Sequence, residues 1–460
     1  MTPDGGTRPR TPRRVLLLTT DPVGAQMSGS AIRAFEVARA LAAAGHLPTL
    51  AAPGRADGVA AAFTVARFDR ENARRTVGGL LRSTDVVVSP LHGLVEMPFL
   101  SRARVPLVID LYDPSLFEIL EAARDLPLAA RRRRVRVETA IWNHVLRRGD
   151  FFLCASERQR DFVLGALAAN GRFVPSGDGR DPSLRALVDV MSYGIPEAPS
   201  APRSEGRPVL RGVHAAIRPH DTVVVWGGST WPWLDAPTAV RAIAAIAKGR
   251  DDVHLVFGST DLPASVPPDR AAAEGVRAVA DGLRMTGRHV HFLEGWLGGE
   301  DWSRLLAECD AGISTHRRHL ESRFAYRLRI VSCLGAGLPV ICTEGDVLAE
   351  LVGRHGLGVV VPELDVAAVA GAIVRIADPE FRAACRARIA EVRPLLSWHL
   401  AARPLVEFCD SLPPRGQRAS RVQLAAAELR VLVASAWRVL SAEGPREAAR
   451  RLQLFLMLRS

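Results

Sequence analysis

The feature that most constrains the fold is a regular alternation of short apolar runs with longer segments of helical periodicity. Residues 31–45, between the first two runs, have apolar residues at helical spacing and end in Ala44-Gly45, just before His46, which predicts a helix with a glycine C-cap. Strands that alternate with helices form right-handed βαβ units and a parallel sheet. The strands predicted in the first half are residues 14–20, 47–52, 64–68, 85–89, 107–111 and 151–155.

The same pattern repeats in the second half, after a stretch at residues 196–219 that is rich in proline, glycine and arginine and predicts a linker. A chain of 460 residues is too long for one ordinary domain. We therefore expect an α/β protein with two Rossmann-like, doubly wound domains that face each other across a cleft, since open parallel sheets bind ligands at their carboxyl edge. The strands predicted here are residues 222–226, 254–257, 290–293, 311–314, 339–343 and 358–361, with helices at 237–247 and 302–308. The predicted division is a first domain at 1–195, a linker at 196–220, a second domain at 221–395, a return helix at 396–412 and a tail at 413–460.

Composition narrows the classes of partner. Hydrophobic residues make up 48% of the chain, enough for two cores, and the formal net charge is +11, with Lys248 as the only lysine. A basic chain attracts phosphates, anionic lipid or nucleic acid. Because no recognition module with interleaved basic and aromatic residues is present, we expect no nucleic-acid partner.

Cysteine usage and the lengths of the apolar runs indicate the cellular compartment of the protein. The six cysteines form no CxxC pair and no zinc spacing, which is typical of buried, reduced thiols. The apolar residues 15–18 are too few for a signal peptide, and no apolar run reaches the roughly 18 residues that span a membrane. We expect a cytoplasmic protein without a metal ion.

The tail at residues 413–460 differs in composition from the two domains. The run Pro413-Pro414-Arg415-Gly416 breaks the chain, and two helical segments follow, the second of them opening with Gly444-Pro445 and arginines. Such a basic amphipathic tail suits docking on an anionic membrane surface, at the inner face of the plasma membrane, and packing of the tail against its own protein fits equally well. The apolar face of the first segment holds Val422, Leu429, Val433, Ala436, Trp437 and Leu440.

Two glycine-containing turns are candidates for a nucleotide site, although the chain has neither GxGxxG after the first strand nor a Walker lysine motif. The first strand leads to Ser28-Gly29-Ser30-Ala31-Ile32-Arg33, where Gly29 and Arg33 would face an anion at a helix N-terminus; an ordinary turn is the alternative. The first strand of the second half ends Trp226-Gly227-Gly228-Ser229-Thr230-Trp231-Pro232-Trp233. There the glycines and Trp231 either approach a ligand or pack a domain face.

Taken in order, these stretches resemble the GT-B glycosyltransferases of bacterial family 4, the group 1 type. The resemblance runs through most of the chain, and its most specific part is LESRFAYRLRIVSCLGAGLPVICTEGD at residues 320–346. The other matching stretches are residues 29–36, 110–114, 154–161, 193–196, 226–235 and 294–296.

The resemblance implies where the donor diphosphate binds: at the start of the helix that precedes Gly337-Leu338-Pro339. Ser322 would cap that helix, and Arg323 and Arg327, four residues apart, would share one face of it. Arg329 points elsewhere and is expected to pair with a carboxylate. The alternative is that all three arginines are solvated or in structural ion pairs.

Departures from the family pattern are concentrated in this segment. The family has two glutamates eight residues apart, and their positions here hold Phe324 and Ser332. The second glutamate usually holds the nucleotide ribose, so Ser332 takes its place, with Glu321 as a possible substitute. The usual Arg and Lys near the first strand of the second domain are absent, and tryptophans stand there instead.

The resemblance implies transfer of a sugar from a nucleotide-sugar donor to a hydroxyl acceptor. It also implies that the anomeric configuration is retained and that no metal or other cofactor is needed. A lipid-linked acceptor fits the basic tail, as in cell-surface polysaccharide or glycolipid assembly, and secondary metabolism is a further context. Two alternatives remain open: a catalytically impaired partner protein of the same fold, and a nucleotide-sugar epimerase. Asp110, Asp113 and His92 follow predicted strands of the first half and are the catalytic candidates; Glu344 and Asp346, after residues 339–343, either contact the donor or cap a helix.

Overall fold

The computed structural model describes residues 11–54, 61–173, 181–196, 208–258, 270–295, 297–412, 421–442 and 444–450. The chain forms two compact units. The first consists of Met1–Ile119, Leu126–Ser192 and Ala401–Ser460, and the second of Leu120–Asp125 and Tyr193–Leu400. The chain therefore crosses from the first unit to the second and back again at its C-terminal end.

The first unit is built on a seven-stranded parallel sheet, in the order β3-β2-β1-β4-β5-β6-β7. β1 is central and buried, because its residues pair on one side with β2 and on the other with β4. The strand order reverses between β1 and β4, and the carboxyl edge at such a switch point is where doubly wound sheets bind ligands. The strands are β1 (Arg14–Leu18), β2 (Leu47–Pro53), β3 (Thr64–Phe68), β4 (Val86–Pro90), β5 (Leu107–Asp110), β6 (Phe151–Cys154) and β7 (Val188–Val190).

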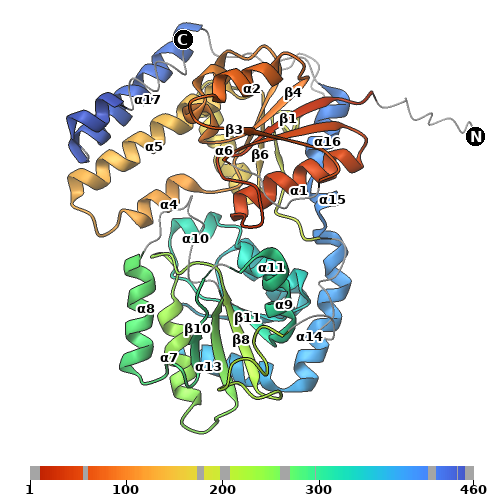
Figure 1. Ribbon diagram of the computed structural model, residues 1–460, viewed down its shortest axis with the longest axis vertical. Helices are drawn as coiled ribbons and strands as arrows, with labels where there is room; N and C mark the ends of the chain where they lie inside the picture. The colour runs from red at the N-terminus through yellow and green to blue at the C-terminus, as the bar shows by residue number, and fades with distance from the viewer. Residues whose placement is uncertain are drawn as a thin grey trace, which may run out of the picture. The chain divides into compact units, whose positions relative to one another are not determined.

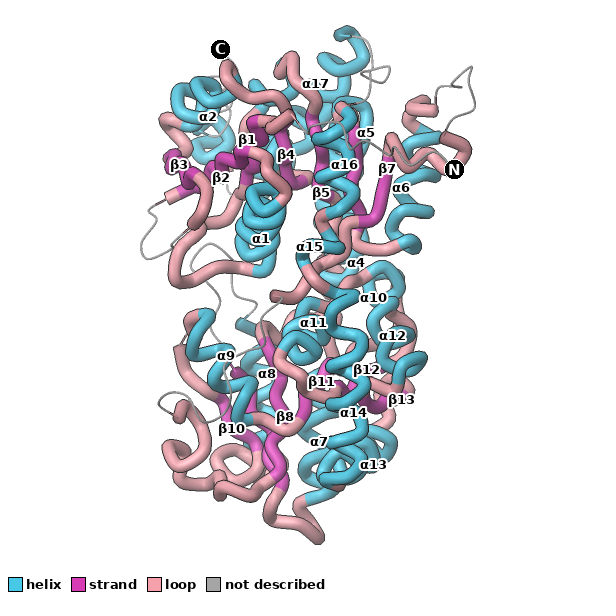
Figure 2. The backbone as a smooth tube through the Cα atoms, turned by 90° about the vertical axis from the view of Figure 1, so that its right-hand side faces the viewer, coloured by secondary structure: helices cyan, strands magenta, loops and turns pink. Residues whose placement is uncertain are grey.

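Helices cover both faces of this sheet (Figures 1 and 2). Two of them come from the end of the chain. The ring of Phe408 in α16 stacks on Phe151 of β6 at 4.6 Å, and α17 runs alongside α5 (Figure 1). The helices are α1 (Gly29–Ala43), α2 (Ala73–Leu81), α3 (Gly93–Glu96), the 3₁₀ turn Pro98–Arg102, α4 (Ser115–Ala122), α5 (Leu128–Arg148), α6 (Glu157–Ala169), α16 (Arg403–Ser411) and α17 (Arg421–Ala442).

The second unit repeats the arrangement with a six-stranded parallel sheet in the order β10-β9-β8-β11-β12-β13. Its strands are β8 (Thr222–Gly227), β9 (Val253–Gly258), β10 (Val290–Phe292), β11 (Ala311–Ser314), β12 (Val340–Thr343) and β13 (Gly358–Val361). Its helices are α7 (Ala236–Ile246), α8 (Arg270–Gly282), α9 (Gly299–Glu308), α10 (Leu320–Phe324), α11 (Leu328–Gly335), α12 (Val347–His355), α13 (Val366–Ala377), α14 (Pro379–Val392), the 3₁₀ turn Arg393–Leu396 and α15 (Trp398–Ala401).

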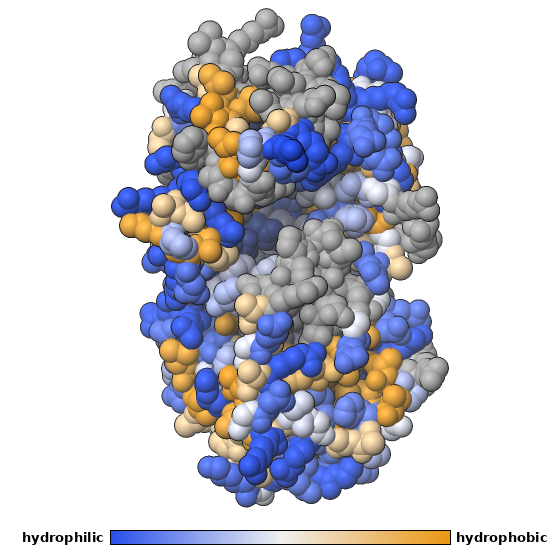
Figure 3. Space-filling view, turned by 60° about the vertical axis from the view of Figure 1, so that its left-hand side comes forward, coloured by the Kyte–Doolittle hydropathy of each residue, from blue (hydrophilic) through white to orange (hydrophobic). Residues whose placement is uncertain are grey.

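The predicted fold class, an α/β protein with two parallel sheets, is confirmed. The twelve predicted strands are all present within one or two residues at each end. β7 was not predicted, because three residues give too short a pattern to recognise. Among the coloured residues on the face shown in Figure 3, hydrophilic residues predominate and hydrophobic residues form separate patches. Within the described residues no helix is both long enough and apolar enough to cross a bilayer.

Candidate functional site

The carboxyl end of β8 leads into the glycine pair Gly227-Gly228, and the two glycines have different roles. A Cβ on Gly227 would lie 3.0 Å from the Trp302 ring, and one on Gly258, its partner on β9, would lie 2.7 Å from the same ring. Both glycines therefore make room for Trp302 of α9. Gly228 has φ +75° and open space where a Cβ would be, so it forms an exposed left-handed turn at the sheet edge.

Arg329 of α11 reaches this turn from the neighbouring helix. Its Nη2 donates to the Ser229 carbonyl at 2.8 Å, and its guanidinium carbon lies 4.4 Å from the centre of the Trp226 ring. Its Nη1 is buried and has no hydrogen-bond partner in the described part of the chain. Burial, and then the positive charge of Arg327, lower the pKa of Arg329 to about 9. The carboxylate partner expected from the sequence is not among the described residues, and an anion at this place would stabilise the cation.

The segment predicted as one helix capped by Ser322 is two helices, and this expectation was wrong. Ala325 between α10 and α11 has extended backbone, with φ −68° and ψ 147°, so Arg323 and Arg327 share no helical face. Ser322 lies inside α10, whose N-cap is His319: the Ser322 amide donates to His319 Nδ1 at 3.1 Å, and the His319 amide donates to Ser322 Oγ at 3.0 Å. α11 begins after Arg327 without a side-chain cap, which leaves its first amide groups available to an anion.

Arg327 and Glu321 form a buried ion pair. Two hydrogen bonds of 2.7 Å join the guanidinium to the carboxylate, and the residues are 7% and 1% exposed. Arg327 Nε also lies 3.7 Å from Oδ2 of Asp346, whose Oδ1 accepts from the Ala349 amide at 2.7 Å and caps α12. Burial raises the pKa of Asp346 to about 6, against the opposing effect of Arg327. Arg327, Glu321 and Asp346, all predicted donor contacts, are thus engaged with one another and hold the turns around α11.

The remaining donor candidates of the second unit keep some exposure. Trp231 stacks on Trp233 with ring centres 5.1 Å apart and planes 3° apart, so one of its faces is already covered. Ser332 is half-buried in α11 and Arg323 is exposed on α10. Glu344 follows β12 with an exposed side chain, 3.4 Å from Arg318.

In the first unit, the amino end of α1 already holds a carboxylate of the same loop. Ser28 caps α1 by accepting from the Ala31 amide at 3.2 Å, and its hydroxyl donates to Asp21 at 2.6 Å. The Ser30 hydroxyl donates to the same carboxylate oxygen. Gly29, the first residue of α1, lies between these serines. Asp21 thus brings a negative charge to the amino end of α1, and this charge opposes a phosphate there.

Arg33 and Asp110 form a second buried clamp. Nε and Nη2 of Arg33 donate to the two oxygens of Asp110 at 2.7 and 2.9 Å. The same guanidinium donates to the carbonyls of Met191 and Ser192 at 2.7 and 2.9 Å, and Arg33 is only 1% exposed. This pair joins the carboxyl ends of β5 and β7 to α1, so neither side chain is free for a substrate.

Asp113 and His92 are the catalytic candidates whose side chains reach solvent. Although the Asp113 side chain is exposed, nearby protein atoms partly desolvate its carboxyl and raise its pKa to about 7, and the Asp110 charge adds to this shift. His92 Nε2 lies 3.2 Å from the Glu138 carboxylate, which also accepts from Ser115 Oγ at 2.5 Å. Desolvation lowers the pKa of His92, but the bond to Glu138 and its charge outweigh this effect and raise it. The two side chains are suited to holding or moving a proton near neutral pH.

Sequence reasoning missed two residues that shape the candidate site, Arg329 and Trp302. Arg329 was set aside because helical geometry turned it away from Arg323 and Arg327. Its partner Ser229 lies 100 residues away in the sequence, so only tertiary packing shows the contact. Trp302 had no signal except the glycines opposite it, Gly227 and Gly258.

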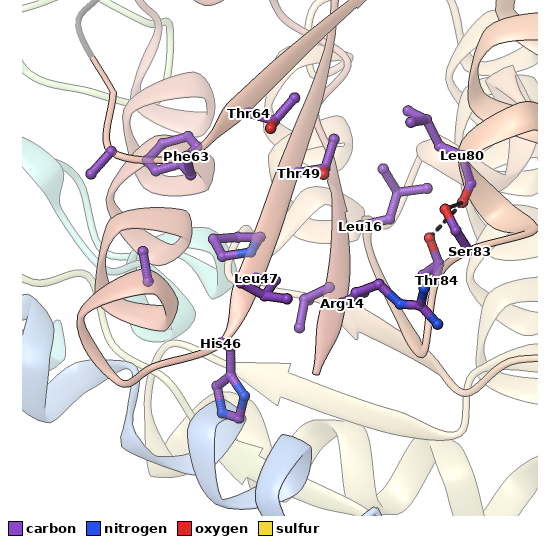
Figure 4. A pocket seen from close by; sticks show the side chains of 14 residues that line it. Arg14, Leu16, His46, Leu47, Thr49, Phe63, Thr64, Leu80, Ser83 and Thr84 are labelled. Atoms are coloured by element: carbon purple, nitrogen blue, oxygen red, sulfur yellow. Dashed lines mark hydrogen bonds between the residues drawn. The ribbon is translucent and has the colours of Figure 1, made fainter. Parts of the chain in front are cut away.

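A pocket of about 440 Å³ lies in the first unit, away from these candidates. Figure 4 shows Arg14, His46 and Leu47 at the amino ends of β1 and β2, with Ser83 and Thr84 donating to the Leu80 carbonyl. Because this is the amino edge of the sheet, the pocket is not at the edge where doubly wound sheets usually bind ligands. No residue predicted for the site lines it.

Residues 221–378 match the family described as Glycosyl transferases group 1. This stretch begins at β8 and ends after α13, so it contains the glycine turn and α11. Among curated proteins, the chitobiosyldiphosphodolichol beta-mannosyltransferase of Kluyveromyces lactis is 42% identical over 66 residues, which is 14% of each chain. The UDP-glycosyltransferase TURAN of Arabidopsis thaliana is 36% identical over 76 residues, 16% of each chain. These matches cover about one seventh of the relatives' length.

Solved structures resemble the chain over far more of its length. Sucrose-phosphate synthase from Thermosynechococcus elongatus superposes with a TM-score of 0.60 at 16% identity, covering 87% of this chain and 99% of that one. The Anabaena protein HepE, solved with UDP-glucose, has a TM-score of 0.59 at 16% identity over 87% and 100%. A trehalose-6-phosphate synthase studied for glycosyl transfer with retention has a TM-score of 0.59 at 13% identity over the same shares. The likeness shows the GT-B fold.

Proposed function

Because the resemblance to the GT-B glycosyltransferases of group 1 is confirmed, we propose that this chain is a retaining glycosyltransferase that moves a sugar from a nucleotide-sugar donor to a hydroxyl acceptor. The single observation that carries this proposal is the half-buried cation of Arg329. It has no counter-ion among the described residues and lies beside the open turn at Gly228. The second unit is thereby assigned the donor.

The donor diphosphate binds between Arg329 and the uncapped amino end of α11 in this proposal. A hydrogen bond from a charged donor to phosphate contributes about 1.5–3 kcal/mol. The α11 N-terminus adds about 0.3–1 kcal/mol for an anion. Arg329 thus supplies the positive charge that the family usually places near the first strand of this domain, which is absent from the sequence there. The same groups stabilise the diphosphate as it departs.

The ribose end of the donor is held without the family's second glutamate. Glu321 does not replace it, since its carboxylate is occupied by Arg327. We assign the ribose to the hydroxyl of Ser332, four residues along α11 from Leu328, with Gly228 and Trp231 beside the base or sugar. A hydroxyl binds a ribose more weakly than a carboxylate does, so a weak donor affinity is expected.

The acceptor belongs to the first unit, where Asp113 is the residue we assign to the acceptor hydroxyl. A carboxyl with a pKa of about 7 is half ionised at neutral pH and takes up a proton readily. Asp110 has a different role, because its two oxygens are held by Arg33. His92, oriented by Glu138, is the second proton carrier.

The reaction as proposed needs no metal or other cofactor, since arginine and helix amides stabilise the diphosphate. We place it in the cytoplasm, in the assembly of a polysaccharide, a glycolipid or a secondary metabolite, where the acceptor is lipid-linked or soluble. UDP-sugars are the first donors to try, because HepE and an Escherichia coli structural relative were solved with UDP-glucose and UDP-2-fluoro glucose.

The test is release of nucleoside diphosphate from UDP-, GDP- and TDP-sugars, with a chelator present and proton NMR reading the anomeric configuration of the product. Without the acceptor, slow donor hydrolysis is expected, and Arg329→Gln removes it while Arg288→Gln, which removes one exposed arginine of the same unit away from the donor candidates, retains it. Turnover that disappears with the chelator would contradict the metal-free part of the proposal, and an inverted product would contradict retention. Donor binding with no turnover, even with extracts that supply acceptors, would favour the impaired partner protein.

A further inference from the structure

Helix α17 has aliphatic residues on two opposite sides. Val431 and Val439, eight residues apart, are only 6% and 3% exposed. Val431 packs into the core of the first unit, with α5 alongside (Figure 1). One side of α17 is therefore fixed to its own protein.

The opposite side of α17 is an aliphatic stripe open to solvent. Leu429, Val433 and Leu440 are 59%, 61% and 45% exposed. At 100° per residue their spacings of four and seven place them within one narrow face. The sequence predicted these residues as part of the apolar face of the segment, and all three are exposed in the structure. Three large aliphatic side chains in a row are more than scattered surface residues require.

The helix that α17 packs against carries an excess of positive charge. α5 contains seven arginines and one acidic residue, Glu138, which is buried and bonded to Ser115. Arg132 and Arg136, four residues apart on one face of α5, are exposed, and neither forms an ion pair with a described residue. Leu128, at the start of the same helix, is 60% exposed.

We propose that α5 and α17 form a docking surface for an anionic lipid bilayer, with the stripe of α17 in the acyl boundary and Arg132 and Arg136 of α5 at the headgroups. Unpaired arginines beside exposed aliphatic residues are the composition of interfacial helices. Each such arginine contributes about 1 kcal/mol near an anionic surface. The protein lies on the bilayer without crossing it, and docking needs no donor or acceptor.

A second copy of this chain is a poorer occupant of the same surface. Two copies that paired through α5 and α17 would bring their unpaired arginines together, and like charges in contact oppose association. The net charge of +11 adds to that repulsion. An anionic bilayer instead complements the arginines and accepts the aliphatic stripe.

The test is flotation of the full chain with vesicles of phosphatidylcholine, with and without phosphatidylglycerol. We expect binding only to the vesicles that contain phosphatidylglycerol. Arg132→Gln/Arg136→Gln weakens it about 30-fold, which is 1 kcal/mol per arginine. Leu429→Gln/Val433→Gln weakens it roughly tenfold or more. All four side chains are exposed, so these variants keep the fold, which circular dichroism checks.

Matched controls come from the second unit. Arg288→Gln/Arg354→Gln removes the same charge from exposed positions, and Leu395→Gln removes an aliphatic side chain that is 67% exposed. Both controls should bind like the unchanged protein. Equal weakening by the two arginine pairs would contradict a specific surface, as would binding that is insensitive to Leu429 and Val433. A concentration-dependent dimer that Leu429→Gln/Val433→Gln abolishes would assign the surface to a second copy. Because flotation requires no catalysis, its outcome is separate from that of the transfer assay.

Discussion

The guanidinium carbon of Arg329 lies 4.4 Å from the centre of the Trp226 ring, and no carboxylate of the described residues pairs with it. Two positions earlier, Arg327 shares two hydrogen bonds of 2.7 Å with Glu321. One arginine is held by an aromatic face and a carbonyl, and the other by a full ion pair. The contrast favours a ligand-binding role for Arg329 and a structural role for Arg327.

Replacing each arginine by methionine should therefore affect the free energy of unfolding differently. Arg329→Met removes a half-buried cation that has no counter-ion, so the free energy of unfolding should stay the same or rise by about 0.5–2 kcal/mol. Arg327→Met leaves Glu321 buried without its partner and should lower it by about 3–5 kcal/mol. Urea unfolding without ligand measures both. Equal losses in the two variants would mean that Arg329 is also a structural residue.

The glycines that face Trp302 should not tolerate a methyl group. In Gly258→Ala the new Cβ would meet the Trp302 ring at 2.7 Å and Leu305 at 2.8 Å, so we expect a loss of about 1–3 kcal/mol in unfolding free energy. Gly275→Ala, in α8 with open space around it, is the control and should stabilise by about 0.5–1 kcal/mol. If Gly258→Ala is rescued neither by Trp302→Leu nor by that change combined with Leu305→Ala, the steric clash is not the cause.

Activity should rise with pH through about 7 if Asp113 receives the acceptor proton. Its pKa is raised to about 7 by desolvation, so the carboxyl is protonated and inactive below that pH and ionised above it. The profile of kcat/KM for the free enzyme should show this ascending limb. Asp113→Asn should abolish the ascending limb of the pH profile and lower the rate roughly 10²–10⁴-fold. A limb that persists near pH 7 in this variant would assign the titration to another group such as His92.

The fold should weaken in acid because of a histidine cluster at the amino edge of the second unit's sheet. His291 Nε2 lies 3.1 Å from His254 Nδ1, and His254 Nε2 lies 3.0 Å from Asp221. Burial, and then the neighbours His214 and His254, lower the pKa of His291 to about 3, well below the value of about 6.5 in an unfolded chain.

Below pH 6.5 the unfolded chain therefore binds a proton that the folded chain excludes. The free energy of unfolding is fully retained above that pH and falls by about 1.4 kcal/mol per pH unit per such histidine below it. Urea unfolding measured between pH 7 and 5 should show that the free energy of unfolding changes less with pH in His291→Asn than in the unchanged protein. An unchanged slope would exclude His291 as the source.

The sheets were predictable because their strands are β-branched runs separated by helical patterns, so β11 and β13 were placed to the residue. The break between α10 and α11 was not, since residues 324–326 contain neither proline nor glycine to mark it. His319 is also outside the residue types that usually cap helices. A single helix was therefore assumed, and with it a shared face for Arg323 and Arg327.

The pairing of charges was even less accessible to sequence reasoning. Glu321 and Arg327 are six residues apart, a spacing that brings no side chains together on one helix and works here only because the chain turns at Ala325. Asp110 and Arg33 are 77 residues apart. The sequence showed which stretches hold polar residues, but the fold decides which of them pair and which, like Arg329 and Asp113, keep a free side.

The central claim, that Arg329 binds the diphosphate of a nucleotide-sugar, is tested most directly by the shift in melting temperature that UDP, GDP, TDP and their sugars produce. We predict that one nucleotide stabilises the unchanged protein and the control Arg288→Gln alike, and that Arg329→Gln loses this stabilisation while keeping its melting temperature without ligand. A loss of about 1.5–3 kcal/mol in binding corresponds to the bond lost from arginine to phosphate. A nucleotide shift of full size in Arg329→Gln, or no shift with any nucleotide in the unchanged protein, would contradict the account.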